Sequence, residues 1–409
     1  MAPIRTVPST ANSESRGNPK PPTGYNLKRV IKGLRVGAKF RYNYEGVHDG
    51  PESYHYPLSL PVEQERPVDP RGPALKLKDL ECVGTLGEGT GGYVLLVRKR
   101  GQAASPPLFA LKSFSKKAVR SKEQMDNATW RNRERTALVS MEWNPFIAGI
   151  LDTFYDARNM YMMLEYSPCG TLHEIIVRGV TPVNALFYFA NIVCGLQHLH
   201  KHGFVHRDLK PGNILVGSDG YLSLCDFGPT APIPRDSEVA TEITHNWFGE
   251  GTLGYQAPEI ITLDGQPPDV RFGTAIDWWA AGTILFLMAT THMPFKTPPP
   301  SKAVSPAEEE AQTQQIWEHI MARPPNWPPQ PRVGPHLKAL VEGLLTVNAN
   351  ARMGLHDVMQ HPWLATVDWT KMRRKRYLPP SLGIPASEEL SGDVKAPDPA
   401  LFPGLCFAA

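Results

Sequence analysis

The strongest constraint on this chain is a pair of short polar segments that lie close together near its middle. Residues 206–213 read HRDLKPGN, and residues 224–228 read LCDFG. In the first segment, Asp208 can accept the proton of an attacking hydroxyl group. Asn213 and Asp226 supply oxygen ligands of the kind that Mg²⁺ prefers, one from each segment. Both segments at this spacing are improbable by chance, so we expect them to form one catalytic site.

A glycine-rich turn precedes these segments. Residues 80–99 are expected to form a strand, a turn and a second strand, and the turn at 87–94 reads GEGTGGYV. Glycines let the backbone close over phosphate groups and offer N–H donors without a Cβ clash. By itself the pattern also fits an ordinary tight turn, so its interpretation depends on the rest of the sequence.

A lysine ends the apolar segment that follows the turn. Lys112 could be a surface lysine with a buried stem, or a cation that holds phosphates. The second role requires an acidic partner, and Glu134 on the expected helix 122–140 is the best candidate. Glu123 and Asp126 lie nearer the start of that helix and remain alternatives.

The composition excludes several classes of protein. Hydrophobic residues make up 41% and charged residues 20%, with a formal net charge of +3, which suits a soluble globular protein without strong attraction to nucleic acid or membrane. No apolar run reaches the ~18 residues of a membrane span. The five cysteines form no Cys-x-x-Cys pair, which favours a reducing, cytoplasmic location. The basic run 373–376 is expected to be a solvated tail, with nuclear import as the alternative. No oligomeric state is predicted.

The order of the expected elements indicates an α+β fold. Strands come first, within 80–99 and again at 160–166. Helices follow at 183–202 and 275–291, and the second of these is apolar around most of its circumference. Residues 297–312 are proline-rich and then acidic, so we expect an exposed loop. Strands followed by helices predict two segregated layers.

Taken in this order, the motifs resemble the signature set of the protein kinases. The resemblance covers about residues 80–363 and implies a bilobal fold. A small β-rich N-lobe would span about 80–165, and a larger helical C-lobe about 168–363. Residues 1–79 would be a weakly structured extension, and residues 364–409 a truncated C-terminal tail.

A finer resemblance is to the AGC group, the relatives of the cyclic-nucleotide-dependent kinases. It is carried by the strand–turn–strand segment 77–97, by MYMMLEYSPCG at 160–170 and by YLPP at 377–380. The resemblance implies ATP and Mg²⁺ as cofactors and protein substrates with a serine or threonine acceptor, because Lys210 has the form typical of serine/threonine kinases.

The resemblance also assigns roles to individual residues. The expected catalytic residues are Asp208, Lys210, Lys112 and Glu134. The expected Mg²⁺ ligands are Asn213 and Asp226. The expected nucleotide-binding residues are Leu86, Gly87, Glu88, Gly89, Thr90, Gly91, Gly92, Tyr93, Val94, Ala110, Lys112, Glu165 and Ser167. Two further residues, Glu259 of the Ala-Pro-Glu segment 257–259 and Arg352, are expected to form a structural ion pair.

The chain departs from the group in three places. Phe248 stands where the group usually carries a phosphorylated threonine, so we expect activation without phosphate at that site. Thr171, Gly212 and Leu287 stand where relatives often carry acids that select basic peptides, so we expect no arginine-directed preference. The chain end, 401–407, lacks the usual hydrophobic docking motif, and tail-dependent activation is not expected.

Three functions are therefore weighed. The preferred one is an active protein serine/threonine kinase that transfers the γ-phosphate of Mg-ATP. The second is a pseudokinase scaffold that binds nucleotide without turnover, which Gly91 at the loop tip and the altered activation loop keep open. The third is a kinase of small molecules, against which the intact segment 257–259 argues, because that segment shapes a peptide platform in this family.

Overall fold

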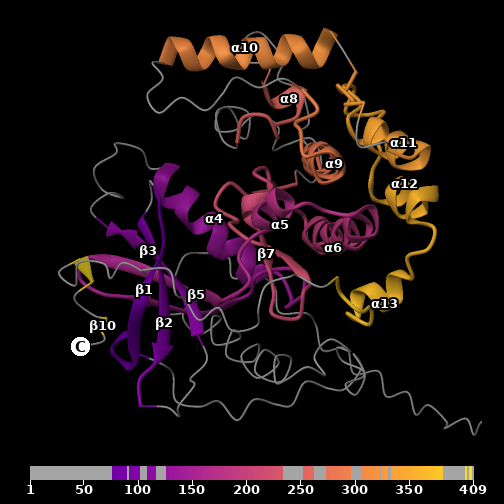
Figure 1. The fold of residues 1–409 in the computed structure, drawn as a ribbon. Helices are drawn as coiled ribbons and strands as arrows, with labels where there is room; N and C mark the ends of the chain where they lie inside the picture. Colours follow the sequence, from indigo (N-terminus) through magenta and orange to yellow (C-terminus); the bar gives the residue numbers. More distant parts are fainter. Residues whose placement is uncertain are drawn as a thin grey trace, which may run out of the picture.

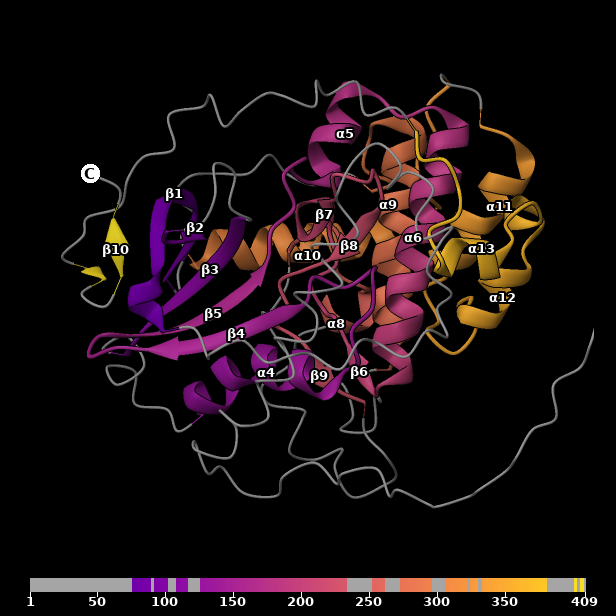
Figure 2. The same cartoon turned by 90° about the horizontal axis from the view of Figure 1, so that it is seen from below.

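The computed structural model describes most of the chain after residue 75 (Figure 1). The described residues are 76–89, 92–101, 108–116, 126–233, 252–261, 273–295, 306–322, 324–329, 333–380, 401–402 and 405–407. An antiparallel sheet with one covering helix forms the N-lobe, and a group of helices forms the C-lobe, as Figures 1 and 2 show. The predicted α+β, bilobal architecture is confirmed.

The N-lobe sheet has six strands in the order β10-β1-β2-β3-β5-β4. Its strands are β1 (Leu80–Gly89), β2 (Gly92–Lys99), β3 (Leu108–Ser115), β4 (Ile150–Tyr155), β5 (Asn159–Glu165) and β10 (Cys406–Phe407). Strands β1 to β5 pair antiparallel, and β10 pairs parallel with β1. The strand–turn–strand prediction for 80–99 and the strand at 160–166 are confirmed.

Alternation along the strands divides the N-lobe side chains between two faces. Phe109 and Leu111 of β3 are buried in the core on the outer face of the sheet, whereas Phe114 joins the main core that Leu138 of α4 also enters. Helix α4 spans Asp126–Ser140 and lies against the inner face (Figure 2). Lys112 therefore faces α4 and the interior between the lobes, because it lies two residues before Phe114 on the same face.

Helices dominate the C-lobe. They are α5 (Leu172–Arg178), α6 (Pro182–Lys201), α8 (Pro258–Ile261), α9 (Ala275–Thr290), α10 (Pro306–Ala322), α11 (Pro335–Leu344), α12 (Leu355–Gln360) and α13 (Trp369–Arg373). Helix α6 begins with Pro182 at its first position and Thr181 as a cap, whose hydroxyl accepts from Asn184 N at 3.3 Å. Helix α9 is buried along almost its whole length, as its apolar sequence predicted.

Short elements carry the polar segments between α6 and α8. They are β6 (Phe204–Val205), the 3₁₀ turn η3 (Pro211–Asn213), β7 (Ile214–Val216), β8 (Leu222–Leu224) and β9 (Ala231–Pro232). Strands β7 and β8 form a hairpin, and β6 pairs with β9. This arrangement brings the HRDLKPGN and LCDFG segments together, because one precedes and the other follows the hairpin.

Three regions differ from the sequence prediction. Residues 306–312 belong to helix α10 and not to a loop; a proline at the first position followed by glutamates suits a helix N-terminus, which offsets the breaker signal of the prolines before it. Leu77, placed in the N-terminal extension, forms part of the turn η2 (Leu77–Asp79) and is buried in the N-lobe core. Phe402, placed in the truncated C-terminal tail, also enters that core.

The basic run 373–376 also differs from its interpretation as a solvated tail. Lys375 is only 7% exposed, and its Nζ donates to Asp219 Oδ2 at 2.8 Å in the protein interior. The buried carboxylate of Asp219 requires a cation, which explains why one lysine of the run turns inward. None of the helices that the structure describes is long and apolar enough to cross a membrane.

Candidate active site

The catalytic loop is fixed by a buried carboxylate on α9. Asp277 accepts the backbone N–H groups of His206 at 2.8 Å and Arg207 at 2.9 Å, and it lies 2.7 Å from His200 Nε2. Burial opposes the ionised form of Asp277, but His200 and these donors outweigh it and lower its pKa. Arg207 adopts a left-handed backbone with φ of 70°, which these bonds stabilise. The loop therefore presents Asp208 in one orientation.

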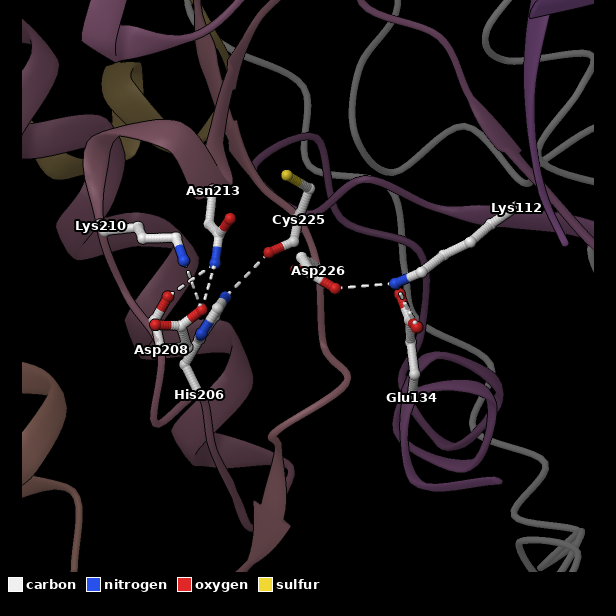
Figure 3. Close-up of polar contacts among 8 residues, drawn as sticks. All are labelled: Lys112, Glu134, His206, Asp208, Lys210, Asn213, Cys225 and Asp226. Atoms are coloured by element: carbon white, nitrogen blue, oxygen red, sulfur yellow. Dashed lines mark hydrogen bonds and ion pairs between the residues drawn. The ribbon is translucent and has the colours of Figure 1, made fainter. Parts of the chain in front are cut away.

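Asp208 is held by three side chains, of which Figure 3 draws Lys210 and Asn213. Its Oδ2 accepts from Lys210 Nζ at 2.8 Å and from Asn213 Nδ2 at 3.0 Å. Its Oδ1 accepts from Thr252 Oγ1 at 2.8 Å, and Lys210 Nζ also donates to Thr252 at 2.6 Å. The carboxylate is only 8% exposed, so its contacts act in a water-poor environment. Such a group can receive a proton from a hydroxyl that reaches it.

Lys112 joins the two lobes. Its Nζ lies 2.7 Å from Glu134 Oε2 on α4 and 2.7 Å from Asp226 Oδ1 (Figure 3). Burial disfavours the charged form of Lys112, but the two carboxylates outweigh it and raise its pKa. Glu134 is the partner, as expected, whereas the alternative Glu123 lies outside the described residues. Lys112 is therefore a fixed cation and not a surface lysine.

The segment that carries Asp226 is tied to the catalytic loop by backbone groups. Cys225 N donates to Asn213 O at 3.0 Å, and the Cys225 carbonyl lies 3.0 Å from His206 Nε2. Burial opposes the ionised form of Asp226, but Lys112 outweighs it and lowers its pKa. The Asp226 side chain is 44% exposed, so it remains accessible to a ligand. Asp208 and Asp226 thus belong to one connected group, as Figure 3 shows.

The residues expected to bind the nucleotide lie on the face of the N-lobe sheet that carries Lys112. Val94 of β2 pairs directly with Lys112 of β3, and Leu96 pairs with Ala110 two residues away. Val94, Ala110 and Lys112 therefore share the face that looks toward Asp226. Leu86, at a register shift in β1, is 39% exposed.

The remaining glycine-loop residues divide between β1 and β2. Gly87, Glu88 and Gly89 end β1, while Gly92 and Tyr93 begin β2. Thr90 and Gly91 lie outside the described residues. The two strands thus lead into and out of the turn as the sequence predicted.

The segment after β5 connects the lobes. Glu165 ends β5, and its carboxylate accepts from Trp143 Nε1 at 2.9 Å and from Gly149 N at 3.0 Å. Because these bonds hold the side chain, only the backbone of Glu165 can serve a nucleotide. Ser167 follows in the same partly buried connection.

A second ion pair supports the segment after the catalytic loop. Arg352 donates to Glu259 Oε1 at 2.7 Å and to Oε2 at 2.8 Å, with its side chain fully buried. The predicted structural pair is present. Bidentate geometry of this kind fixes orientation as well as charge.

Sequence reasoning missed Thr252 and Ser113 as parts of the site. Thr252 binds Asp208 from 44 residues away, and no local pattern distinguishes that threonine. Ser113 is buried, and its hydroxyl accepts from Tyr93 N at 3.2 Å and donates to Tyr93 O at 3.1 Å. A serine within an apolar strand was the available signal. Phe248 lies outside the described residues.

The fold and the site define a two-lobed phosphotransferase. Lys112 of the N-lobe sheet reaches the loop that carries Asp226, and that loop is bound to the loop that carries Asp208. The model of the protein kinase domain matches residues 80–364. The catalytic subunit PRKX of cAMP-dependent protein kinase from Homo sapiens is 31% identical over 320 residues, which cover 76% of this chain and 79% of that protein. The chain belongs to the protein kinase family.

Other relatives are also protein kinases. Protein kinase 2 of Dictyostelium discoideum is 32% identical over 302 residues, or 73% of this chain and 56% of that protein. Atypical protein kinase C of Drosophila melanogaster is 27% identical over 350 residues, or 82% of this chain and 54% of that protein. The chain spans about half the length of these two relatives. The resemblance to AGC serine/threonine kinases is confirmed.

Proposed function

We propose that this chain is a catalytically active protein serine/threonine kinase that transfers the γ-phosphate of ATP, with Mg²⁺, to hydroxyl groups of protein substrates. One observation carries the proposal: Lys112 Nζ lies 2.7 Å from both Glu134 and Asp226, which joins the small lobe to the polar loop of the large lobe. A protein kinase requires this cation to be held in place before it can position phosphates.

The residues present fit a magnesium ion. Asp226 is partly exposed and has a lowered pKa, so it is ionised at neutral pH. Asn213 donates to Asp208 through Nδ2, which leaves its Oδ1 available to bind a metal ion. Asp226 and Asn213 would hold the ion, and a bound Mg²⁺ neutralises charge on the phosphates. Mg²⁺ prefers oxygen ligands, and an aspartate and an asparagine supply them.

The catalytic steps follow from the side chains already placed. Asp208 accepts the proton of the substrate hydroxyl as the hydroxyl oxygen bonds to the γ-phosphorus. The bond between the γ-phosphorus and the bridging oxygen of the β-phosphate breaks in the same transfer, and ADP is the leaving group. Lys210, bound to Asp208 and Thr252, is positioned to balance negative charge on the transferred group. Lys112 holds the α- and β-phosphates. Most of the rate gain comes from this positioning and charge stabilisation.

The alternative of an inactive scaffold receives no support from the site. Asp208, Lys210 and Asn213 are connected by hydrogen bonds, and Lys112 has both of its acidic partners. A kinase of small molecules is also disfavoured, because Glu259 of the expected peptide platform is anchored by Arg352.

For peptide selection, we propose the absence of a strong arginine preference. Thr171 and Leu287 replace acids, and Glu174, the nearest possible substitute, is used as a helix cap by accepting from Thr171 N at 2.8 Å. Burial opposes ionisation of Glu174, but these hydrogen bonds outweigh it and lower its pKa. A peptide library that showed strong selection for arginine before the acceptor would contradict this proposal.

A cytoplasmic location is proposed for the chain. All five cysteines are free, which supports a reducing compartment. The run 373–376 is not proposed as a nuclear-import signal, because Lys375 is buried against Asp219. Fractionation of cells that express tagged protein tests this proposal, and enrichment in the nucleus would contradict it.

The function is tested with Asp208→Asn. The change keeps the shape of the side chain but removes the proton acceptor, so phosphate transfer from Mg-ATP to mixed peptides should fall on the order of 10²-fold or more. Binding of a fluorescent ATP analogue should change little. Asp357→Asn, on the exposed start of α12, is the matched control and should keep full activity. Equal labelling by wild type and Asp208→Asn would overturn the proposed function.

A further inference from the structure

The strands on either side of the glycine turn extend beyond the backbone pairing that holds them to β3. The ladder between β1 and β2 continues to Gly89 opposite Gly92. The ladder between β2 and β3 ends earlier, at Val94 opposite Lys112. The last residues of β1 and the first two residues of β2 therefore project past this second ladder, and Figure 2 shows the three strands side by side.

The side chain of Ser113 binds β2 at the point where the ladder stops. Because Val94 pairs with Lys112, a continued register would place Tyr93 opposite Ser113. The Ser113 hydroxyl instead accepts from Tyr93 N at 3.2 Å and donates to Tyr93 O at 3.1 Å. One hydroxyl thus binds both backbone groups that an antiparallel partner would bind, and we call this contact the Ser113 anchor.

A serine at this position is surrounded by apolar side chains. Ser113 is 3% exposed and shares the outer face of β3 with Phe109 and Leu111. Its cross-strand neighbour on β5 is Tyr161, which belongs to the same core. A buried hydroxyl is unfavourable unless its donor and acceptor sites are filled, and the anchor fills both. The hydroxyl therefore has a specific partner in the backbone of β2.

Gly92 allows the close approach that the anchor requires. Its φ is 148°, and a Cβ at this position would collide with the backbone carbonyl of Ser113. The backbones of β2 and β3 are thus in direct contact beside the anchor. Gly92 and Tyr93 together fix the distance between the start of β2 and β3, the first by contact and the second by hydrogen bonds.

The anchor lies next to the lysine that is expected to bind the phosphates. Ser113 follows Lys112 on β3, and alternation places the two side chains on opposite faces of the sheet. Lys112 Nζ is fixed 2.7 Å from both Glu134 and Asp226. The start of β2 is therefore held at a set distance from a fixed cation. This placement matters for a ligand that both groups bind, because small displacements of positioning groups weaken such interactions.

We propose that Ser113 is a positioning residue for the phosphates of ATP. Its hydroxyl holds the glycine-rich ends of β1 and β2, residues 87–89 and 92–93, over the phosphates that Lys112 binds. The proposal rests on the proposed function, because it concerns the nucleotide of the same site. Ser113 does not touch the nucleotide, since its side chain lies on the opposite face of the sheet. Its effect therefore depends on the phosphates and not on the adenosine.

The first test compares Ser113→Ala with Ser140→Ala in the full-length chain. Ser140 ends α4 at the surface, and its hydroxyl donates to Thr136 O within the same helix, so its removal leaves β2 and β3 unchanged. Loss of the anchor should raise Kd for ATP and ADP about five- to tenfold and change Kd for adenosine by less than about twofold. KM for ATP should rise with Kd, while kcat stays within about twofold of wild type. Ser140→Ala should match wild type in every value.

A merely structural role predicts another pattern. It would lower the melting temperature of Ser113→Ala and leave the ratio of the adenosine Kd to the ATP Kd unchanged, and an unchanged ratio would overturn the proposal. If Ser113→Ala does not fold, Ser113→Thr and Ser113→Val provide a pair of similar shape that differs in one hydroxyl. Tighter ATP binding by Ser113→Thr would support the anchor, and equal or weaker binding would reject it.

The same measurements separate the anchor from the proposed function. Nucleotide affinities are obtained by competition with a fluorescent ATP analogue and without any acceptor, so they report on the anchor even if no peptide is phosphorylated. A lowered preference for ATP over adenosine in Ser113→Ala would support the anchor, whatever the result for phosphate transfer. An unchanged preference together with normal transfer would overturn the anchor and leave the kinase assignment intact.

Discussion

The two lobes contribute to one site but are held together differently. In the C-lobe, Asp208 takes its partners from within 50 residues, and the loop that carries it is bound by Asp277 of the largely buried helix α9. In the N-lobe, two buried members of the outer core, Phe402 and Leu405, come from the far end of the chain. The surroundings of Asp208 in the C-lobe are therefore built from residues nearby in the sequence. The outer core of the N-lobe also needs residues from the far end of the chain.

The difference has a physical cause. A large helical domain buries enough apolar surface to stabilise a polar network inside it, and the C-lobe core around Trp278 and Trp279 is of this kind. A thin sheet has one face against α4 and another that needs a separate cover. In this protein that cover includes the terminal segment. We thus expect C-lobe changes to affect stability and kcat, and N-lobe changes to affect KM for ATP.

The largest effect is expected from Arg352→Ala in the C-lobe. It leaves Glu259 without its bidentate partner in a buried setting, which should cost about 3–5 kcal/mol in the free energy of unfolding. Thermal unfolding and kcat measure the change. Lys338→Ala is the control, because its Nζ lies 3.9 Å from Glu342 at the surface and should cost less than about 1 kcal/mol. Similar losses for both variants would remove the contrast between the buried and exposed pairs.

An intermediate effect is expected from Gly92→Ala in the N-lobe. The new Cβ would lie 1.9 Å from Ser113 O, so β2 must move away from β3 at the loop exit. KM for ATP should rise about tenfold, equivalent to roughly 1–2 kcal/mol, with a smaller change in kcat. Gly101→Ala provides the control, since φ there is also positive, at 70°, but nothing lies within 4 Å. A normal KM in folded Gly92→Ala would show that the loop exit does not govern nucleotide affinity.

The smallest effect is expected from His198→Gln, on α6 of the C-lobe. Burial, together with His202 beside it, lowers the pKa of His198 from 6.5 to about 4. The unfolded chain therefore binds a proton below about pH 6.5 that the folded chain refuses, and stability falls as pH decreases toward 4. His198→Gln should reduce this loss by about 1 kcal/mol at pH 5. Melting temperatures at pH 7 and pH 5 measure it, and an unchanged pH dependence would contradict the shifted pKa.

Much of this protein could be predicted from local patterns. The strands around the glycine turn, the buried helices α6 and α9, and the positions of Asp208 and Asp226 all follow from periodicity and motif spacing. The loop prediction was wrong for residues 306–312, because the prolines before the helix were given more weight than the helix-forming residues after them. The prediction of a solvated tail was wrong for Lys375. Charge runs are usually solvated, and its partner Asp219 lies 156 residues away in the sequence.

The sequence alone determined which chemical groups are available and in what order, because strand, turn and helix preferences act over a few residues. Only the tertiary structure decided which groups meet. It paired Glu134 with Lys112, joined Thr252 to Asp208 and inserted Phe402 beside Tyr93. Such contacts depend on burial and shape across long chain separations, and no local pattern carries that information.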